Sequence, residues 1–298
     1  MHLEDNEIEF HPLQGFKAVS LALNVPGCAA AHRLRELGAL VTKIEPLAGD
    51  PLIGMSREWY ELLTQDMAVF RLDLKDQAQH RLLEERLREA DLLLSSMRPA
   101  ALQRLNLGWQ DLHAQYPQLC HIAFVGHPEP EGNRPGHDLT YQAEAGLISP
   151  PDLPRTLLAD LSGVERAVSS ALALLLARER GHGPAFLQVS LFESGQAFTA
   201  PLRFGLTVPG GILGGGLPGY NIYPARSGWV AVATLEGRFQ EKLIRELGLR
   251  QGDTLDEAFR TKTAGEWVEW AKARDVPLAE VRHIAPNPPP MEEYTRAY

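Results

Sequence analysis

Cysteine is scarce in this chain, and no apolar run is long enough to span a membrane. Only Cys28 and Cys120 occur among 298 residues, which indicates two plain thiols in a reducing compartment rather than a disulfide framework. The longest apolar run, Ala171–Ala177, falls far short of the roughly 20 residues of a membrane helix. The acidic stretch 1–10 lacks the apolar core of a signal peptide. We therefore expect a soluble, cytoplasmic protein.

Basic residues are also in deficit, with 29 Lys and Arg against 38 Asp and Glu and a net charge of −9. This balance argues against a nucleic-acid partner, because such partners are bound by neutralising many phosphates. It leaves room for a local basic pocket that binds one phosphorylated cofactor. Hydrophobic residues make up 44% of the chain and charged residues 22%, which excludes a disordered or fibrous protein.

Apolar stretches typical of buried strands alternate with helical stretches through the first half of the chain. We predict strands at Phe16–Leu23, Leu40–Glu45, Val69–Leu74, Asp91–Ser95, Leu119–Val125 and Phe186–Leu191, and helices at Cys28–Leu37, Asp76–Arg88, Gln110–Gln115 and Asp160–Arg180. Continuous apolar strands joined by amphipathic helices are typical of a parallel sheet covered on both faces. The predicted fold class is therefore α/β, with a doubly wound, mostly parallel sheet.

The composition changes near residue 205, which suggests a second domain. Residues 1–205 are expected to form the large α/β domain, and the stretch 206–219 is too rich in glycine for a helix or strand interior and is expected to be a linker. Residues 220–284 are expected to form a smaller α/β domain, and the proline-rich residues 285–298 an extended tail. In the smaller domain we predict strands at Trp229–Ala233 and Leu278–Arg282 and helices at Arg238–Leu247 and Ala264–Lys272.

The strand–helix–strand unit that opens the chain invites a test for dinucleotide binding, since Glu45 ends its second strand. The dinucleotide fingerprint needs three glycines, so that the backbone can approach a pyrophosphate. The turn at 24–29 contains only Gly27. We therefore expect no nicotinamide cofactor.

A series of short motifs then follows in a characteristic order. The motifs are Leu13–Val19, Pro26-Gly27, Leu37–Pro46, Gly49–Pro51, Leu72–Lys75, Ala90–Leu92, Arg98-Pro99 and Leu105–Trp109. The series resembles the family III CoA-transferases, which include formyl-CoA and carnitine CoA-transferases and α-methylacyl-CoA racemase, from about residue 13 to about residue 282. The resemblance implies coenzyme A or an acyl-CoA thioester as substrate, no metal, and an interlocked homodimer.

The resemblance also implies roles for three acid or base side chains. Asp160 aligns with the family's catalytic aspartate, which carries CoA as a thioester in transferases and relays protons in racemases. His137, in a Gly-His-Asp motif, matches the racemase histidine that faces this aspartate, and Glu236 matches a residue that sets the charge of the histidine. Proton exchange next to a thioester needs an acid and a base on opposite faces of the carbon. The combination favours racemase chemistry. The alternatives are CoA transfer through Asp160 and a shortened homologue that has lost CoA binding.

Taken by themselves, the same three residues also allow structural roles. Asp160 stands where the N-cap of the long helix belongs, and there backbone N–H groups and the helix dipole keep a carboxylate ionised, unless a neighbour shares its proton and holds it as an acid/base group. His137 suits a turn, and Glu236 suits a solvated strand end.

The cations that the family places before its Leu-Asp-Leu-Lys motif are missing. The stretch Thr64–Phe70 has no Lys or Arg and one acid, Asp66, while Gly126–Gly132 has prolines and glutamates where the family has small residues. Because an acid repels a polyanion, we expect poor CoA affinity from these loops. The remaining candidates for phosphate contact are Arg98, Lys43 and Arg71, each of which also suits a surface charge. The backbone of Gly214, Gly215 and Gly216 would allow close approach of a thioester, although a flexible linker has the same composition.

Overall fold

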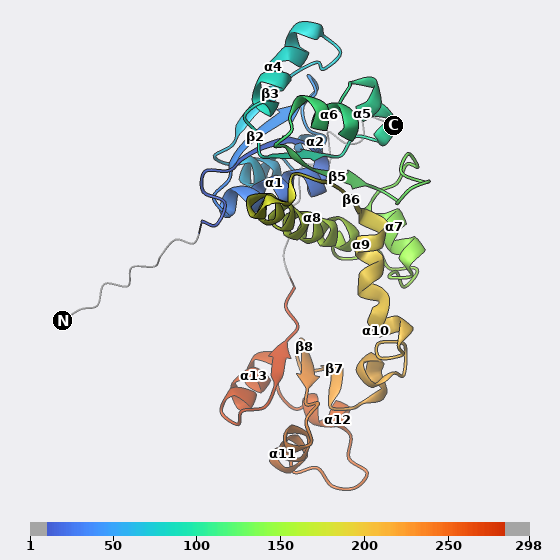
Figure 1. The fold of residues 1–298 in the computed structure, drawn as a ribbon. Coiled ribbons are helices and arrows are strands. Elements are labelled where there is room, and N and C mark those ends of the chain that lie inside the picture. The colour runs from blue at the N-terminus through green and yellow to red at the C-terminus, as the bar shows by residue number, and fades with distance from the viewer. Residues whose placement is uncertain (1–10, 284–298) are drawn as a thin grey trace, which may run out of the picture. The chain divides into compact units, whose positions relative to one another are not determined.

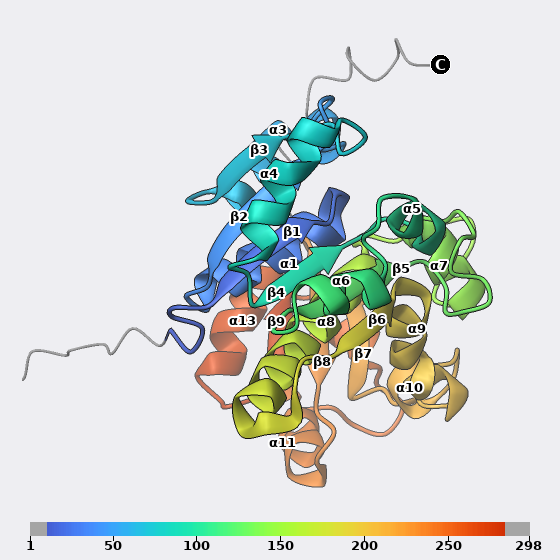
Figure 2. The same ribbon diagram turned by 45° about the horizontal axis from the view of Figure 1, so that its top comes forward.

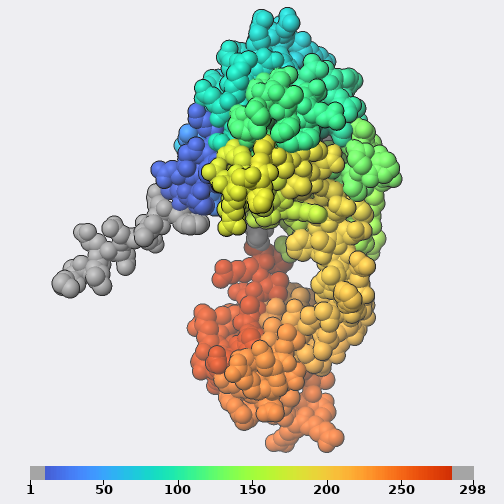
Figure 3. All heavy atoms as spheres, in the orientation of Figure 1, coloured from blue at the N-terminus to red at the C-terminus, as the bar shows by residue number. Residues whose placement is uncertain are grey.

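The structure is a computed structural model that describes residues 11–283 (Figure 1). Two compact units divide the chain, the first ending at Phe198 and the second beginning at Thr199. The glycine-rich stretch 206–219 falls inside the second unit, and the expected tail at 285–298 lies outside the described residues. The heavy atoms of both units are drawn as spheres in Figure 3.

A six-stranded, fully parallel sheet forms the centre of the first unit. Its strands are β1 (Lys17–Leu21), β2 (Leu40–Glu45), β3 (Ala68–Arg71), β4 (Leu92–Ser95), β5 (Cys120–Val125) and β6 (Phe186–Ser190). They lie in the order β3-β2-β1-β4-β5-β6. Strands β2 and β3 are added to one side of β1 and the later ones to its other side, so the strand order reverses between β1 and β4. The predicted α/β class with a doubly wound parallel sheet is confirmed, and ligands of such sheets bind at this reversal, beyond the carboxyl ends of the strands.

Helices cover both faces of this sheet because the strands are apolar on both sides. The helices are α1 (Asn24–Glu36), α2 (Leu52–Met55), α3 (Arg57–Thr64), α4 (Gln77–Leu87), α5 (Pro99–Arg104), α6 (Trp109–Gln115), α7 (Asp138–Ala145), α8 (Leu158–Ala177) and α9 (Leu191–Gln196). One buried cluster contains Leu34 of α1 and Val168 of α8. The other contains Leu83 of α4 and Leu112 of α6, helices that lie over one face of the sheet in Figure 2. None of the helices in the described part of the chain is long and apolar enough to cross a bilayer.

The second unit is a smaller α/β body, as expected. An antiparallel sheet joins β7 (Tyr220–Pro224), β8 (Trp229–Ala233) and β9 (Leu278–Glu280) in that order. Its helices are α10 (Ala200–Arg203), α11 (Gly237–Leu247), α12 (Leu255–Phe259) and α13 (Ala264–Lys272). Phe259 and Trp267 anchor its core, and the Trp267 indole N–H donates a 2.7 Å hydrogen bond to the Phe259 carbonyl.

Candidate functional site

A pocket of about 360 Å³ opens near the sheet reversal, beyond the carboxyl ends of β1, β4 and β5. We call it the histidine pocket, and its lining includes Leu23, Ser96, Arg98, Arg134, His137 and Tyr141. All of these residues belong to the first unit. The pocket therefore lies where a doubly wound sheet is expected to bind its ligand.

His137 is the N-cap residue of α7 and presents an exposed side chain to this pocket. Its backbone N–H donates a 3.1 Å hydrogen bond to Thr140 Oγ1, and Thr140 Oγ1 donates back to the His137 carbonyl at 2.8 Å. These bonds fix the backbone at the start of α7. The imidazole is exposed, so a ligand in the pocket can reach it.

Asp138, the next residue, ties the start of α7 to the start of α8. One carboxylate oxygen accepts the backbone N–H of Asp160 at 3.0 Å, and the other accepts the Gln142 side-chain amide at 2.6 Å. The same Gln142 amide donates to the Thr156 carbonyl at 2.9 Å. The Gly-His-Asp motif and the Asp160 motif are thus joined directly. Sequence reasoning quoted Asp138 but gave it no role.

Asp160 does not occupy the predicted position. The helix begins at Leu158, so Asp160 lies inside the first turn and the N-cap is Leu157. The Asp160 carboxylate is 8% exposed and accepts no hydrogen bond from the described residues. Burial, reinforced by repulsion from the Asp138 carboxylate, raises the pKa of Asp160 from its ordinary 3.8 to about 7. The expected N-cap position of Asp160 is therefore wrong, and its raised pKa fits the alternative of an acid/base group rather than a carboxylate that stays ionised.

Tyr141 forms a buried wall of the same pocket, one turn into α7. A Cβ atom at Gly126 or Gly136 would overlap its ring, so these glycines let the loop pass close to the tyrosine. Burial, together with the charge of Asp160, raises the pKa of Tyr141 to about 12. The phenol therefore remains a neutral hydrogen-bond donor at physiological pH.

One of the two glutamates in the loop at 126–132, Glu131, is paired with a nearby arginine. Buried His127 places Nε2 3.0 Å from Glu144 Oε2, and Arg134 donates to Glu144 Oε1 at 2.8 Å and to Glu131 at 3.1 Å. The hydrogen bond from His127 is the main cause that lowers the pKa of Glu144. Glu131 is therefore paired with Arg134, so it repels an anionic ligand less than the sequence suggested.

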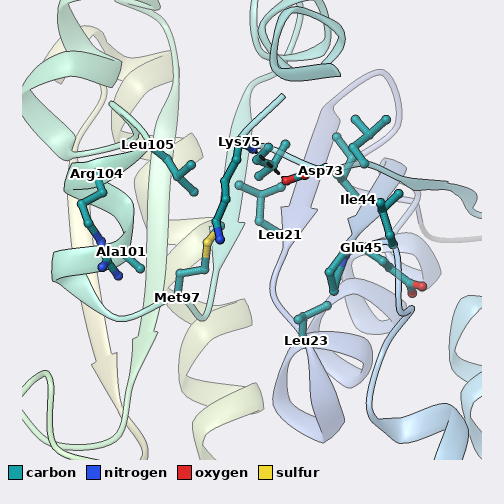
Figure 4. Close-up of a pocket in the computed structure, with 14 residues that line it drawn as sticks. Leu21, Leu23, Ile44, Glu45, Asp73, Lys75, Met97, Ala101, Arg104 and Leu105 are labelled. Carbon is teal, nitrogen blue, oxygen red and sulfur yellow. Dashed lines mark hydrogen bonds between the residues drawn. The ribbon is translucent and has the colours of Figure 1, made fainter. Parts of the chain in front are cut away.

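A larger pocket of about 630 Å³ adjoins the histidine pocket and is drawn in Figure 4. We call it the switch-point pocket, and its mostly apolar lining includes Leu21, Leu23, Ile44, Met97, Lys75 and Arg104. Leu23 belongs to both pockets, and Met97 of one precedes Arg98 of the other. The two pockets therefore lie side by side along the carboxyl edge of the sheet, with Leu23 between them.

Two cations line this larger pocket together with the acids Glu45 and Asp73, and a third cation lines the pocket next to it. The first two are Lys75 and Arg104, and the Lys75 side chain extends towards Met97 in Figure 4. Both also line an adjoining pocket of about 580 Å³ that includes Arg81. None of the three forms an ion pair with an acid in the described part of the chain. Unpaired cations in a concave surface favour an anionic ligand. The sequence analysis did not identify these cations as candidates for contact with an anionic ligand, although Lys75 ends the Leu-Asp-Leu-Lys motif.

Among the residues predicted to contact phosphate, only Arg98 lines the histidine pocket. Lys43 is completely buried, and its ammonium donates to Asp50 at 2.9 Å, so the structure does not offer it to a ligand. Arg71 is half exposed at the end of β3, with Nε 3.7 Å from Glu45 Oε2. Glu45 also accepts the Tyr60 hydroxyl at 2.7 Å.

The remaining predicted residues lie in the second unit. Glu236 is the exposed N-cap residue of α11. Gly214, Gly215 and Gly216 lie in the irregular turn at 212–216, where Gly215 has a φ of +91°. A Cβ at Gly214 or Gly216 would meet backbone atoms, so the turn requires glycine for its own packing.

The doubly wound sheet and the histidine pocket at its carboxyl edge define the chain as an α/β protein with a candidate ligand site at its sheet reversal. Sequence comparison assigns the family: the pattern of CoA-transferase family III matches residues 13–286, and the chain belongs to that family. The resemblance expected from the ordered motifs is confirmed.

Curated relatives include both transferases and a racemase. The chain is 32% identical over 207 residues to the probable fatty acyl-CoA transferase Rv3272 of Mycobacterium tuberculosis, covering 61% of this chain and 51% of the relative. It is 28% identical over 204 residues to acetyl-CoA:oxalate CoA-transferase of Acetobacter aceti, covering 63% and 52%. It is 27% identical over 281 residues to human α-methylacyl-CoA racemase, covering 87% and 70%. The chain thus spans about half the length of the two transferases.

A solved structure shows the same fold. The crystal structure of the Mycobacterium tuberculosis protein Rv3272 superposes with a TM-score of 0.80 at 23% identity, covering 92% of this chain and 84% of that one. The crystal structure of a CAIB/BAIF family protein from Brucella suis superposes with a TM-score of 0.77 at 19% identity, covering 91% of this chain and 84% of that one.

Proposed function

We propose that this protein binds an acyl-CoA thioester and moves a proton at the carbon next to the thioester carbonyl, as a racemase does. The observation that carries the proposal is the buried carboxyl group of Asp160, with a pKa of about 7, on a segment bonded directly to the motif of His137. A general acid or base works best when its pKa lies near the operating pH. Family membership supplies the class of substrate.

In this proposal His137 and Asp160 act on opposite faces of the substrate carbon. One group removes the α-proton, and the electron pair of the broken C–H bond moves into the thioester carbonyl to give an enolate. The other group then delivers a proton to the opposite face, so that the configuration inverts and the atoms balance. Glu236 is proposed to set the charge of His137, as the family resemblance implies.

The two adjoining pockets suit the length of CoA. We assign the phosphates to the unpaired cations Lys75, Arg81 and Arg104 and the adenosine to the apolar switch-point pocket. The pantetheine arm would then pass Leu23 and Arg98 and bring the thioester to His137. The backbone of Gly214–Gly216 is proposed to approach the acyl group. Cations of this edge thereby replace those missing from Thr64–Phe70.

CoA transfer through an aspartyl thioester is the second candidate function. It rests on the family resemblance, in which the aspartate that Asp160 matches carries CoA as a thioester, and a carboxylate is a suitable nucleophile for that step. Two relatives reported above are named as transferases. A raised pKa leaves this nucleophile fully ionised only above neutral pH.

One experiment separates these functions. The protein is incubated in deuterated water with a single epimer of a 2-methylacyl-CoA, and both the product and the protein are analysed by mass spectrometry. Interconversion of the epimers with deuterium uptake in the parent, and loss of the interconversion in His137→Ala, supports the racemase. A hydroxylamine-sensitive CoA adduct on Asp160, formed with an acceptor acid and no deuterium uptake, supports the transferase. Absence of both, with no CoA binding by calorimetry, overturns the two proposals and leaves a shortened homologue that has lost CoA binding.

A further inference from the structure

A buried ionic network lies directly behind the wall that the two pockets share. Asp50 is 3% exposed and Lys43 is completely buried. The Lys43 ammonium donates to Asp50 Oδ2 at 2.9 Å and to the Ala22 carbonyl at 2.9 Å. The Cys28 thiol donates to the same carboxylate oxygen at 3.2 Å. Neither charge lines a pocket, so neither contacts a ligand bound there.

The network holds the turn between β1 and α1. Asp50 accepts the backbone N–H of Asn24 at 3.0 Å and that of Leu52 at 2.9 Å. Asn24 has a φ of +62°, a conformation that non-glycine residues adopt rarely. The first turn of α1 has no side-chain cap from Leu23, so the Asp50 carboxylate supplies the acceptor that this helix end requires.

This turn forms the partition between the pockets. Leu23 lines both of them, and Asn24 and Pro26 line the histidine pocket. On its other side the Leu23 N–H donates to Ser96 Oγ at 2.9 Å. The backbone at residues 22–24 is thus fixed at three successive positions: Ala22 by Lys43, Leu23 by Ser96 and Asn24 by Asp50.

We propose that Lys43 and Asp50 are a buried positioning pair that fixes the β1–α1 turn and thereby sets the affinity for the CoA thioester without touching it. The inference rests on the proposed function for the identity of the ligand. A buried ion pair adds little net stability compared with apolar residues of similar volume, because both charges lose their hydration. Its geometric effect is specific, since one carboxylate and one ammonium together hold the backbone on both sides of Leu23.

The test uses a double variant, Lys43→Met with Asp50→Asn, which removes both charges of the pair. Buried Glu45, whose Oε1 lies 3.7 Å from the Lys43 ammonium, keeps Arg71 as its partner at 3.7 Å in this variant. The matched control is Arg178→Met with Asp91→Asn, which removes a 2.9 Å ion pair of the same unit that lines neither pocket. Hydrogen–deuterium exchange of peptides covering 22–27 reports on the turn without any ligand. Calorimetry with CoA reports affinity, and deuterium uptake at saturating 2-methylacyl-CoA reports the chemical step.

In the Lys43/Asp50 double variant we expect faster exchange at 22–27, a CoA dissociation constant raised about tenfold, and a saturating rate within about threefold of the parent. The control double variant should leave all three close to the parent. Unchanged exchange at 22–27, or equal weakening of CoA binding by both double variants, would overturn the proposal. If the parent protein binds no CoA, the proposed function fails, while the exchange data still decide whether the pair fixes the turn.

Discussion

The backbone N–H of Asp160 donates a 3.0 Å hydrogen bond to the Asp138 carboxylate. This bond caps the first turn of α8 from another helix, and it places a second negative charge beside a buried carboxyl group. The same contact therefore holds the Asp160 segment in place and raises the pKa of its side chain. In the proposed mechanism Asp138 positions and tunes Asp160.

Replacing Asp138 with Asn is expected to lower the pKa of Asp160. The amide oxygen can still accept the Asp160 N–H, but the repelling charge is gone, while burial, the larger cause, remains. The inflection assigned to Asp160 in the pH profile of kcat/KM should therefore move below pH 7 but stay above 3.8. Glu165→Gln, on an exposed part of α8, is the control and should leave the inflection in place. An upward shift in Asp138→Asn would contradict this assignment.

Asp160→Asn is expected to stabilise the protein at neutral pH. The folded-state pKa of about 7 exceeds the ordinary 3.8, so the unfolded chain releases this proton first and rising pH favours unfolding across that window. The stabilising contribution of the protonated group is complete below about pH 4 and is lost as pH rises to 7. The Tm of the variant minus that of the parent should grow by a few degrees between pH 4 and pH 7. A constant or shrinking difference would show that the pKa is not raised.

Ala substitutions at Lys75, Arg81 and Arg104 are each expected to weaken CoA binding about tenfold, because each removes a cation proposed to contact phosphate. The weakening should shrink at high salt, which screens exposed charges. Calorimetry at low and high salt provides the measurement. Arg57→Ala, whose side chain is 72% exposed on α3, serves as the control. Equal effects of Arg57→Ala and the three substitutions would place the phosphates elsewhere.

The sequence was sufficient for the sheet but not for the groups buried around the site. Apolar runs such as β5 can only be central strands, so the parallel sheet was predictable. The start of α8 was not predictable, because the acceptor that caps its first turn comes from Asp138, 22 residues away from Asp160 in sequence. Lys43 looked like a phosphate ligand because nothing local shows that Asp50 would enclose it. The strand β7 was missed because it includes Pro224 and is exposed or half-buried throughout.

We also expect a homodimer, in line with the family resemblance. Gel filtration at micromolar concentration should give an apparent mass twice the 33.0 kDa of the chain. A single peak at the monomer mass would contradict this expectation.

The most direct test of the central claim is epimer-resolved deuterium exchange at the α-carbon of 2-methylacyl-CoA. If His137 and Asp160 act on opposite faces, the parent should interconvert both epimers, whereas His137→Ala should exchange the α-proton of one epimer only and interconvert neither. Asp160→Asn should show the complementary preference. Continued interconversion in either variant, or exchange of the same epimer in both, would contradict a two-base site.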